Sequence, residues 1–351
     1  MTRTAVVLFN LGGPDSLEAV EPFLFNLFSD PAIIRLPRLF RHFVAGRISR
    51  RRAPIAQEIY RQIGGKSPIV EQTEAQAKAL QEALSDLGQV RVFIAMRYWH
   101  PKSDVTAIEV RGFAPDRIML LPLYPQFSTT TSKSSLVDWY RAASNVGLVA
   151  PRVTTTALCC YATSDGMIEA QGELIAPLLA AAVAKGPVRL LLSAHGLPER
   201  IVKRGDPYAW QVEQTAARIV AKLGIGGLDW KLCYQSRVGP MQWIGPATED
   251  EIKRAGADGV ALVVAPIAFV SEHSETLVEL DIEYRELAEA SGVPAYDRAP
   301  AIGCHPAFIS ALADLTRQSL NRAPSQDDSM FSLDGGRVCP AQHSGCPLAA
   351  D

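Results

Sequence analysis

The chain has 351 residues, enough for one large domain or two ordinary ones, and its 48% apolar and 21% charged residues are typical of a folded globular protein. Lys and Arg number 35 against 37 Asp and Glu, so the formal charge of -2 lacks the global basic excess of nucleic-acid-binding proteins. The longest apolar runs, 174–184 and 259–270, are shorter than the ~18–20 residues of a membrane span. We therefore expect a folded protein that neither crosses a bilayer nor binds nucleic acid.

The N-terminal stretch predicts a first strand followed by a turn. Residues 4–11 are apolar, and Gly12-Gly13-Pro14-Asp15 follows them without the small-residue cleavage site of a signal peptide. We therefore expect a cytoplasmic protein, in which thiols stay reduced. Its six cysteines are then expected to be buried, metal-bound or incidental rather than paired in disulfides.

Short apolar runs rich in β-branched residues alternate along the chain with segments of helical periodicity. The predicted strands are 5–9, 90–95, 117–121, 153–160, 188–193, 230–234 and 260–265. The predicted helices between them include 68–87, 167–184, 209–223 and 272–290. Near-continuous apolar strands that alternate with helices are typical of parallel sheets covered on both faces, and so of an α/β fold.

The strand ends of the first half of the chain are weakly similar in sequence to those of the second half. They read LFNLGGP, AMRYWHP and MLLPLYP in the first half, and LSAHGLP, CYQSRVGP and VVAPIAF in the second. This internal similarity predicts two similar Rossmann-like halves, 1–160 and 161–324, each a parallel sheet flanked by helices. The polar tail, 325–351, is expected to be appended to them. Because ligands of open parallel sheets bind beyond the carboxyl ends of the strands, we expect the six strand ends to face a shared cleft.

Three segments imitate common functional signatures without fitting them. LGGPD lacks the third glycine of a dinucleotide-binding motif. Gly64-Gly65-Lys66-Ser67 has Tyr60 where a phosphate-binding loop needs its first glycine. The sequence around His195 is not the nucleophile elbow of a hydrolase. Nucleotide binding and hydrolysis are therefore not expected.

His195 is the strongest candidate for catalysis in the second half. It ends an apolar strand, and the small residues Ala194 and Gly196 beside it leave room for a ligand. A single His at a strand end is more often a structural residue held by hydrogen bonds. The catalytic interpretation is favoured by residues 271–276, SEHSET, which add a second imidazole and two carboxylates at the end of another strand.

The SEHSET segment is expected to form the first turn of a helix with Ser271 as its N-cap. Capping and the helix dipole account for Glu272 or Glu275, but a cation such as His273 is disfavoured there. If both strand ends face one cleft, an imidazole and a carboxylate oppose each other, which suits proton abstraction coupled to binding of a divalent metal. The glutamates farther along this helix face are expected to be solvated, namely Glu279, Glu283 and Glu286.

The segment 22–52 mixes aromatic and aliphatic residues with seven arginines and one acid, Asp30. This composition suits a surface that dips into anionic lipid headgroups, or a mouth that accepts an apolar molecule with carboxylates. The alternative is a buried helix whose arginines extend to the solvent.

Seven segments, in this order, resemble the ferrochelatases. They are LFNLGGPDS, RQIGGKSPI, MRYWHP, LPLYPQFSTTTSKSS, SAHGLPERIVKRGDPY, YQSRVGPMQWIGP and APIAFVSEHSETLVELDIEY, and they cover residues from about 4 to 310. The resemblance implies two Rossmann-like halves and a lyase that inserts Fe2+ into protoporphyrin IX, with release of two protons, to give haem b.

The resemblance also implies roles for individual residues. His195 and Glu275 match the essential histidine and carboxylate of the family, which act in catalysis and contact the metal. The implied substrate-binding residues are Arg61, Arg97, Tyr98, Trp243, Glu272 and His273. Glu272 stands where some members have Asp. The segment 22–52 matches a lip over the active-site mouth through which members contact the membrane, and contact with the preceding porphyrin-producing enzyme is a further implied interaction.

The chemistry of metal insertion agrees with these residue types. A free-base porphyrin loses two pyrrole protons and bends before iron enters, so an imidazole can accept a proton while a carboxylate binds or relays cations. The alternatives are a coproporphyrin ferrochelatase, another tetrapyrrole metal chelatase, and a tetrapyrrole carrier without turnover. A carrier does not need the pair His195 and Glu275.

The tail contains two cysteines and a histidine within eight residues, Cys339, His343 and Cys346. Some ferrochelatases hold a 2Fe-2S cluster with one internal Cys and three tail Cys in the pattern C-x6-C-x-C. Cys339 and Cys346 match the first two tail positions, and Cys159 or Cys160 matches the internal one. Leu348 stands where the third tail Cys belongs. The resemblance therefore predicts a cluster with an altered ligand set, in which both internal cysteines or His343 contribute.

Overall fold

The structure is a computed structural model that describes residues 2–150, 152–237, 239, 241–322 and 329–348. It shows an α/β protein with two parallel sheets, as the alternating pattern predicts. The chain forms two compact units. Unit 1 comprises Met1–Cys160, Leu312–Val338 and Pro347–Asp351, and unit 2 comprises Tyr161–Ala311 and Cys339–Cys346.

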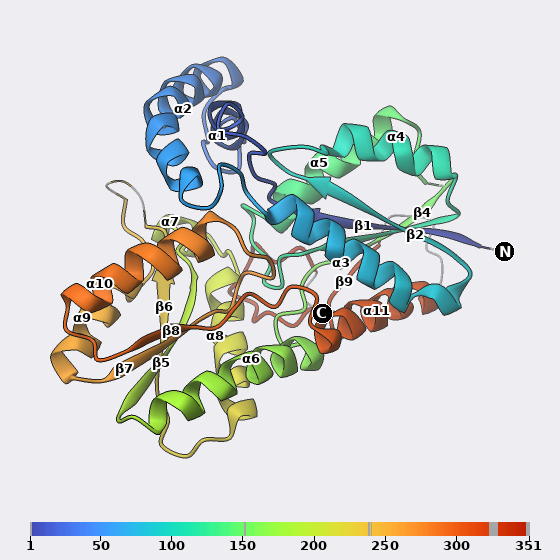
Figure 1. Cartoon of the computed structure of the whole chain (residues 1–351). Helices are drawn as coiled ribbons and strands as arrows, with labels where there is room; N and C mark the ends of the chain where they lie inside the picture. The colour runs from blue at the N-terminus through green and yellow to red at the C-terminus, as the bar shows by residue number, and fades with distance from the viewer. Residues whose placement is uncertain (1, 151, 238, 240, 323–328, 349–351) are drawn as a thin grey trace. The chain divides into compact units, whose positions relative to one another are not determined.

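The sheet of unit 1 has the strand order β2-β1-β3-β4-β9, and all its pairs are parallel. Its strands are β1 (Arg3–Asn10), β2 (Gln89–Met96), β3 (Arg117–Pro122), β4 (Thr154–Leu158) and β9 (Ser329–Phe331). The flanking helices are α3 (Ile69–Ala83), α4 (Ser103–Phe113), α5 (Ser132–Asn145) and the C-terminal part of α11 (Pro306–Asn321). A short 3-10 helix, η1 (Ser85–Leu87), follows α3. In Figure 1, α4 and α5 lie on one face of this sheet, and α3 and α11 lie on the other.

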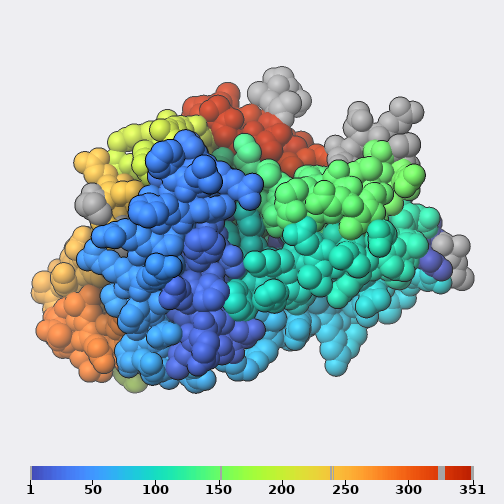
Figure 2. All heavy atoms as spheres, turned by 90° about the horizontal axis from the view of Figure 1, so that it is seen from above, coloured from blue at the N-terminus to red at the C-terminus, as the bar shows by residue number. Residues whose placement is uncertain are grey.

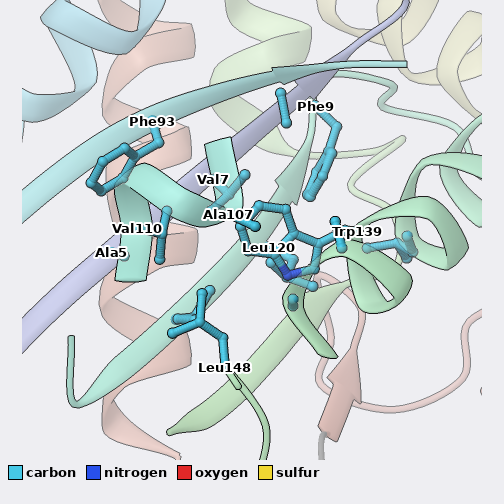
Figure 3. Packing of buried hydrophobic residues seen from close by; sticks show 14 of the residues in the cluster. Ala5, Val7, Phe9, Phe93, Ala107, Val110, Leu120, Trp139 and Leu148 are labelled. Atoms are coloured by element: carbon cyan, nitrogen blue, oxygen red, sulfur yellow. The ribbon is translucent and has the colours of Figure 1, made fainter. Parts of the chain in front are cut away.

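The core of unit 1 explains why β1 is so apolar. Seven of its eight residues are buried because helices cover both faces of this central strand. On the face beneath α4 and α5, Phe9 packs edge-on against Trp139 with ring centroids 5.8 Å apart (Figure 3). This packing fixes the carboxyl ends of β1 and β2, which precede the candidate site residues of unit 1.

The segment 22–52 folds into a pair of packed helices, α1 (Val20–Phe28) and α2 (Arg38–Arg61). The inner face of α2 buries Ala45, Ser49 and Ala53, one helical turn apart. On its outer face, Leu39, Phe40 and Phe43 are between 68% and 83% exposed, so α2 is not a buried helix. In the space-filling view of Figure 2, α1 and α2 form one continuous surface, drawn in blue.

The sheet of unit 2 has the order β6-β5-β7-β8, again with only parallel pairs. Its strands are β5 (Val188–His195), β6 (Asp229–Gln235), β7 (Ala261–Pro266) and β8 (Tyr296–Arg298). The helices α6 (Asp165–Val183) and α8 (Tyr208–Leu223) pack together, and α9 (Thr248–Asp258) and α10 (Tyr284–Ala290) form a second pair, with α7 (Glu199–Val202) after β5. All seven predicted strands are confirmed, whereas the three-residue strands β8 and β9 were too short to be predicted.

The helix predicted over 272–290 is partly wrong. Residues 271–274 form a loop, and the helix that follows is a π-helix, η2 (Glu275–Glu283), which continues into α10. No side chain caps η2, so Ser271 is not the predicted N-cap. The side chain of Thr276 instead accepts a hydrogen bond from the backbone N–H of His273. Because π-helical turns are frequently found at functional sites, this segment is a candidate for a functional role.

The C-terminal region also differs from the prediction. Residues 312–324 were predicted to belong to the second half, but Leu312–Val338 belongs to unit 1. The tail is not a simple appendage, because β9 pairs with β4 and extends the sheet of unit 1. In addition, Arg317 donates hydrogen bonds to the carbonyl of Ala83 and to the carboxylate of Asp86.

One described helix, α6, is long and apolar enough by length and composition to cross a membrane. It packs against β5, β7 and α8, and buries Met167, Ile175 and Leu179 among others. This packing is that of a core helix of unit 2.

Candidate active site

The candidate site of unit 2 lies at the carboxyl ends of neighbouring strands. His195 ends β5 and pairs in register with Gln235, which ends β6. The loop after β7 leads to Glu272, His273 and Glu275. Parallel strands present their carboxyl ends at one edge of the sheet, so residues from three distant segments of sequence meet there.

Glu275 lies between two imidazoles. Its Oε1 is 3.6 Å from Nε2 of His195, and its Oε2 is 3.6 Å from Nε2 of His273. His195 and Glu275 are 37% and 28% exposed, whereas the side chain of His273 is 9% exposed. The structure therefore brings together the predicted catalytic pair and adds a buried histidine on the other side of the carboxylate.

Nδ1 of each imidazole contacts a backbone carbonyl, and Nε2 faces Glu275. Nδ1 of His195 lies 2.6 Å from the carbonyl of Gly196, and Nδ1 of His273 lies 3.1 Å from the carbonyl of Ser271. A carbonyl only accepts hydrogen bonds, so both Nδ1 atoms carry their protons. Both Nε2 atoms are then the positions that gain or lose a proton beside the carboxylate.

Charge at this site is concentrated on Glu275. Burial alone would raise the pKa of this carboxyl group, but the nearby charges of His195 and His273 lower it to about 2. Burial would lower the pKa of His273, yet its contact with the carboxylate of Glu275 raises it above the usual value. Glu275 is therefore ionised at neutral pH and favours a proton on the adjacent imidazole.

Glu279 is a site residue that the sequence interpretation missed. It was expected to be solvated, but it accepts hydrogen bonds from the side chains of Gln235 and Tyr284 and from the backbone N–H and hydroxyl of Ser236. Burial and the nearby charge of Glu275 raise its pKa. Glu279 lies one turn after Glu275 in the π-helix η2. The sequence pattern predicts an ordinary helix, so it did not indicate this position. Glu283 and Glu286 are exposed, as expected.

Gln235 connects the two glutamates. Its Nε2 donates to the backbone carbonyl of Glu275 at 2.9 Å and to the carboxylate of Glu279 at 3.0 Å. Its own oxygen accepts a hydrogen bond of 2.8 Å from Ser193 on β5. The YQSRVGP segment contained this residue, but a glutamine at a strand end has no sequence signal of its own.

Aromatic side chains border the histidines. Trp243 lies beside Gly196, where a Cβ atom would come within 3.3 Å of the indole ring. Phe269 contacts both imidazoles, with ring centroids 6.5 Å from His195 and 4.6 Å from His273. The predicted cleft-wall residue Trp243 is therefore placed next to the His195 loop.

Glu272 pairs with Arg298 and not with the two histidines or Glu275. Its Oε1 accepts hydrogen bonds from Nη1 of Arg298 at 2.7 Å and from the backbone N–H of Ala301 at 2.9 Å. Burial alone would raise its pKa, but the charge of Arg298 lowers it. The predicted substrate-binding residue is therefore engaged in an ion pair within the protein.

The candidate residues of unit 1 converge on Asp30. Oδ2 of this carboxylate, whose side chain is 2% exposed, accepts hydrogen bonds of 2.8 Å from Arg97 and Tyr98, and another from Ser134. Arg97 also donates to Ser134 at 2.7 Å. Tyr98 is 1% exposed within the apolar cluster beneath α1 and α2, so its side chain is buried and not open to the solvent. Burial, and then Asp30, raise the pKa of Tyr98 well above its usual value, which keeps this phenol a hydrogen-bond donor.

Arg61 lies apart from this group. It is the last residue of α2, half of its side chain is exposed, and it pairs with Glu58 at 2.8 Å. The structure thus places it on the helix surface and not with Asp30 and Arg97.

The four cysteines predicted to bind a cluster belong to different units. Cys159 and Cys160 are buried in unit 1 with Phe127, and Leu348 packs against this cluster. Cys339 and Cys346 are buried in unit 2, where Gln211 donates a hydrogen bond to the sulfur of Cys339. Within the described ranges, no group of three or more His, Cys, Asp or Glu side chains is arranged to hold a metal ion.

Comparison with known families identifies the family to which this chain belongs. A sequence profile of the family described as ferrochelatase matches residues 3–320. The chain belongs to the ferrochelatase family. A ferrochelatase of Phenylobacterium zucineum is 51% identical to it over 347 residues, which cover 98% of this chain and 97% of the relative. A ferrochelatase of Caulobacter vibrioides is 50% identical over 348 residues, with the same coverage.

Solved structures agree on the fold of this ferrochelatase family member. SirB from Bacillus subtilis with Fe3+ matches with a TM-score of 0.53 and 14% identity, covering 91% of this chain and 96% of SirB. The sirohydrochlorin chelatase SirB of Bacillus subtilis subspecies spizizenii in complex with cobalt gives a TM-score of 0.51 at 12% identity, covering 91% and 95%. At such low identity the likeness shows the chelatase-type fold alone.

Proposed function

We propose that this chain inserts Fe2+ into protoporphyrin IX, releasing two protons and forming haem b, the last step of haem synthesis. The observation that supports this proposal most directly is the placement of Glu275 between His195 and His273 in a chain of the ferrochelatase family. Imidazole and carboxylate are the groups that proton removal and ferrous iron both require.

In the proposed mechanism, His195 is the base for the pyrrole protons. Its Nδ1 proton is directed to Gly196, so the Nε2 lone pair accepts the proton. The negative charge of Glu275 then stabilises the imidazolium that forms. Two N–H bonds of the porphyrin break and the four ring nitrogens bind the iron, so the charges balance when two protons leave as Fe2+ enters. The same pair, His195 and Glu275, is proposed to contact the iron as it enters.

Anaerobic metal insertion tests this function. Purified protein is mixed with Fe2+ and either protoporphyrin IX or coproporphyrin III, and the change in porphyrin absorbance is followed. We expect turnover with protoporphyrin. Faster turnover with coproporphyrin would identify a coproporphyrin ferrochelatase. Insertion of Co2+ but not Fe2+ would identify another chelatase, and binding without turnover would identify a carrier.

We infer that α1 and α2 attach the protein to a membrane surface. Leu39, Phe40 and Phe43 are strongly exposed at the start of α2, and Arg47, Arg50 and Arg51 follow on the next turns. Phe43 and these arginines line a hollow of about 580 Å3 together with Phe25 and His42. An apolar end followed by arginines suits insertion among anionic headgroups, where each arginine contributes about 1 kcal/mol. This inference supports a cytoplasmic protein at the inner face of the membrane, where contact with the preceding porphyrin-producing enzyme is a related proposal.

Vesicle flotation measures this attachment. We expect binding to vesicles that contain phosphatidylglycerol, weaker binding at high salt, and loss of binding when Leu39, Phe40 and Phe43 are all replaced by Ser. Val137→Ser, which removes an exposed apolar residue of α5, is the control and should bind normally. Equal binding to neutral vesicles, or unchanged binding of the triple variant, would contradict the proposal.

The 2Fe-2S cluster remains a separate prediction from the resemblance. If Cys339 and Cys346 bind a cluster with Cys159 and Cys160, anaerobically purified protein should be reddish and contain acid-labile sulfide, and Cys339→Ser should abolish both. Cys233→Ser, which removes a buried thiol of β6, is the control. Colourless protein without sulfide after anaerobic reconstitution would show that Leu348 and the buried thiols form ordinary apolar packing.

A further inference from the structure

Arg298 is a buried arginine with no role in the proposed chemistry, although it contacts both segments that position the site. It ends the edge strand β8, and its side chain is 8% exposed. Its Nε and Nη2 donate to the two oxygens of Asp281 at 2.8 and 2.5 Å, and its Nη1 donates to Glu272 at 2.7 Å. A planar guanidinium can satisfy two carboxylates in this fixed geometry, which a lysine cannot reproduce.

The two carboxylates belong to the loop and the helix that hold the catalytic groups. Glu272 immediately precedes His273, and its second hydrogen bond, from Ala301, fixes the loop 271–274 to the chain after β8. Asp281 lies in η2, the π-helix that begins with Glu275. Arg298 therefore connects the segment on the N-terminal side of Glu275 with the helix on its C-terminal side.

The π-helix has other attachments to β8. The hydroxyl of Tyr296 donates to the carbonyl of Leu280 in η2 at 2.7 Å, and Arg285, in the helix α10 that continues η2, donates to the carbonyl of Tyr296 at 2.6 Å. A π-helical turn is rare and less favourable than an α-helical one, so it persists where its surroundings determine it. The contacts from β8 supply such surroundings. Without Arg298, the carboxylates of Glu272 and Asp281, 14% and 29% exposed, would lose their common cation, and both segments would be free to shift.

We propose that Arg298 is a positioning residue for metal insertion. By holding Glu272 and Asp281 together, it sets the spacing of His273 and Glu275 and keeps the helix in its π-helical register. The proposal rests on the proposed function, because its effect is measured as turnover.

Arg189 supplies a matched control. It is also a buried arginine of unit 2, 9% exposed, and it pairs with two carboxylates, Asp229 at 2.8 Å and Asp258 at 2.9 Å. It lies at the start of β5, whereas His195 ends that strand, so about 20 Å of extended chain separate the two residues. Removing Arg189 breaks an ion pair with two carboxylates, which are 43% and 45% exposed, and leaves the site untouched.

The test compares Arg298→Ala, Arg298→Lys and Arg189→Ala in the full chain, with turnover of the unaltered protein measured in parallel. We expect kcat of Arg298→Ala to fall about 10- to 100-fold, since a displacement of about 1 Å is enough for such a loss. The porphyrin KM should stay within about twofold of its original value. Guanidinium ions at concentrations far below denaturing should restore part of kcat in Arg298→Ala, whereas sodium at equal ionic strength should not. Arg298→Lys retains the positive charge, but its kcat should stay below that of the unaltered protein.

The outcomes separate the proposal from a general loss of stability. Arg189→Ala should keep kcat near the original value and show no response to guanidinium. If Arg298→Ala does not fold, Arg298→Lys decides the question, because it should show reduced kcat together with faster hydrogen exchange of the amides of 275–283. Unchanged kcat in a folded Arg298 variant, or equal losses in Arg298→Ala and Arg189→Ala, would overturn the proposal. Absence of turnover in the unaltered protein would instead contradict the proposed function.

Discussion

Replacing His195 by Ala is expected to reduce iron insertion at least about 100-fold, because general acid–base catalysis by a positioned side chain contributes roughly 10²–10⁴-fold. The side chain is partly exposed at the end of β5, and its loss leaves no base with a free Nε2 atom at that position. Porphyrin binding should persist. Stopped assays under anaerobic conditions measure turnover, and quenching of porphyrin fluorescence measures binding.

His305→Ala is the control for this variant. His305 lies in the same unit and pairs with Glu173 of α6 at 3.1 Å, not with the glutamates of the site. It should retain normal turnover. Retention of more than about a tenth of the original rate by His195→Ala, a barrier change below roughly 1.4 kcal/mol, would mean that His195 is not the base.

Replacing Glu275 by Gln is expected to have an effect of similar size. Glutamine keeps the shape of the side chain but removes the charge that stabilises a proton on either imidazole. Because the pKa of Glu275 is lowered from 4.5 to about 2, the stabilisation from its negative charge is fully present above pH ~4.5 and is lost as the pH falls towards 2. The loss of activity in Glu275→Gln should therefore be present throughout the neutral range.

The same substitution should change the titration of His273. Glu275 raises the pKa of this imidazole, so the stabilisation from its protonated form is present below pH ~6.5 and is lost as the pH rises through the raised pKa. In Glu275→Gln that raised pKa should fall, which NMR titration of the imidazole protons measures. Glu283→Gln, on an exposed position of the same helix segment, should change neither turnover nor titration. An unchanged His273 titration in Glu275→Gln would refute this electrostatic account.

The sequence by itself determined the fold class and the chemistry of the site. Apolar runs such as that of β1 are continuous because both faces of a parallel strand are buried, so their positions are visible without a structure. His195 was identifiable because small neighbours flank a histidine at the end of such a run. The family motifs then named Glu275, and the structure places it 3.6 Å from His195.

Only the tertiary structure decided how each charged side chain is used. The spacing of the glutamates predicts an ordinary solvated helix, but Glu279 is engaged by Gln235 and Ser236, which come from another segment, and by Tyr284 at the end of its own helix. Glu272 and Glu275 look equivalent in SEHSET, yet one pairs with Arg298 and the other with two histidines. The physical reason is that burial and partners, not residue type, set the charge and direction of a carboxylate, and those partners lie far away along the chain.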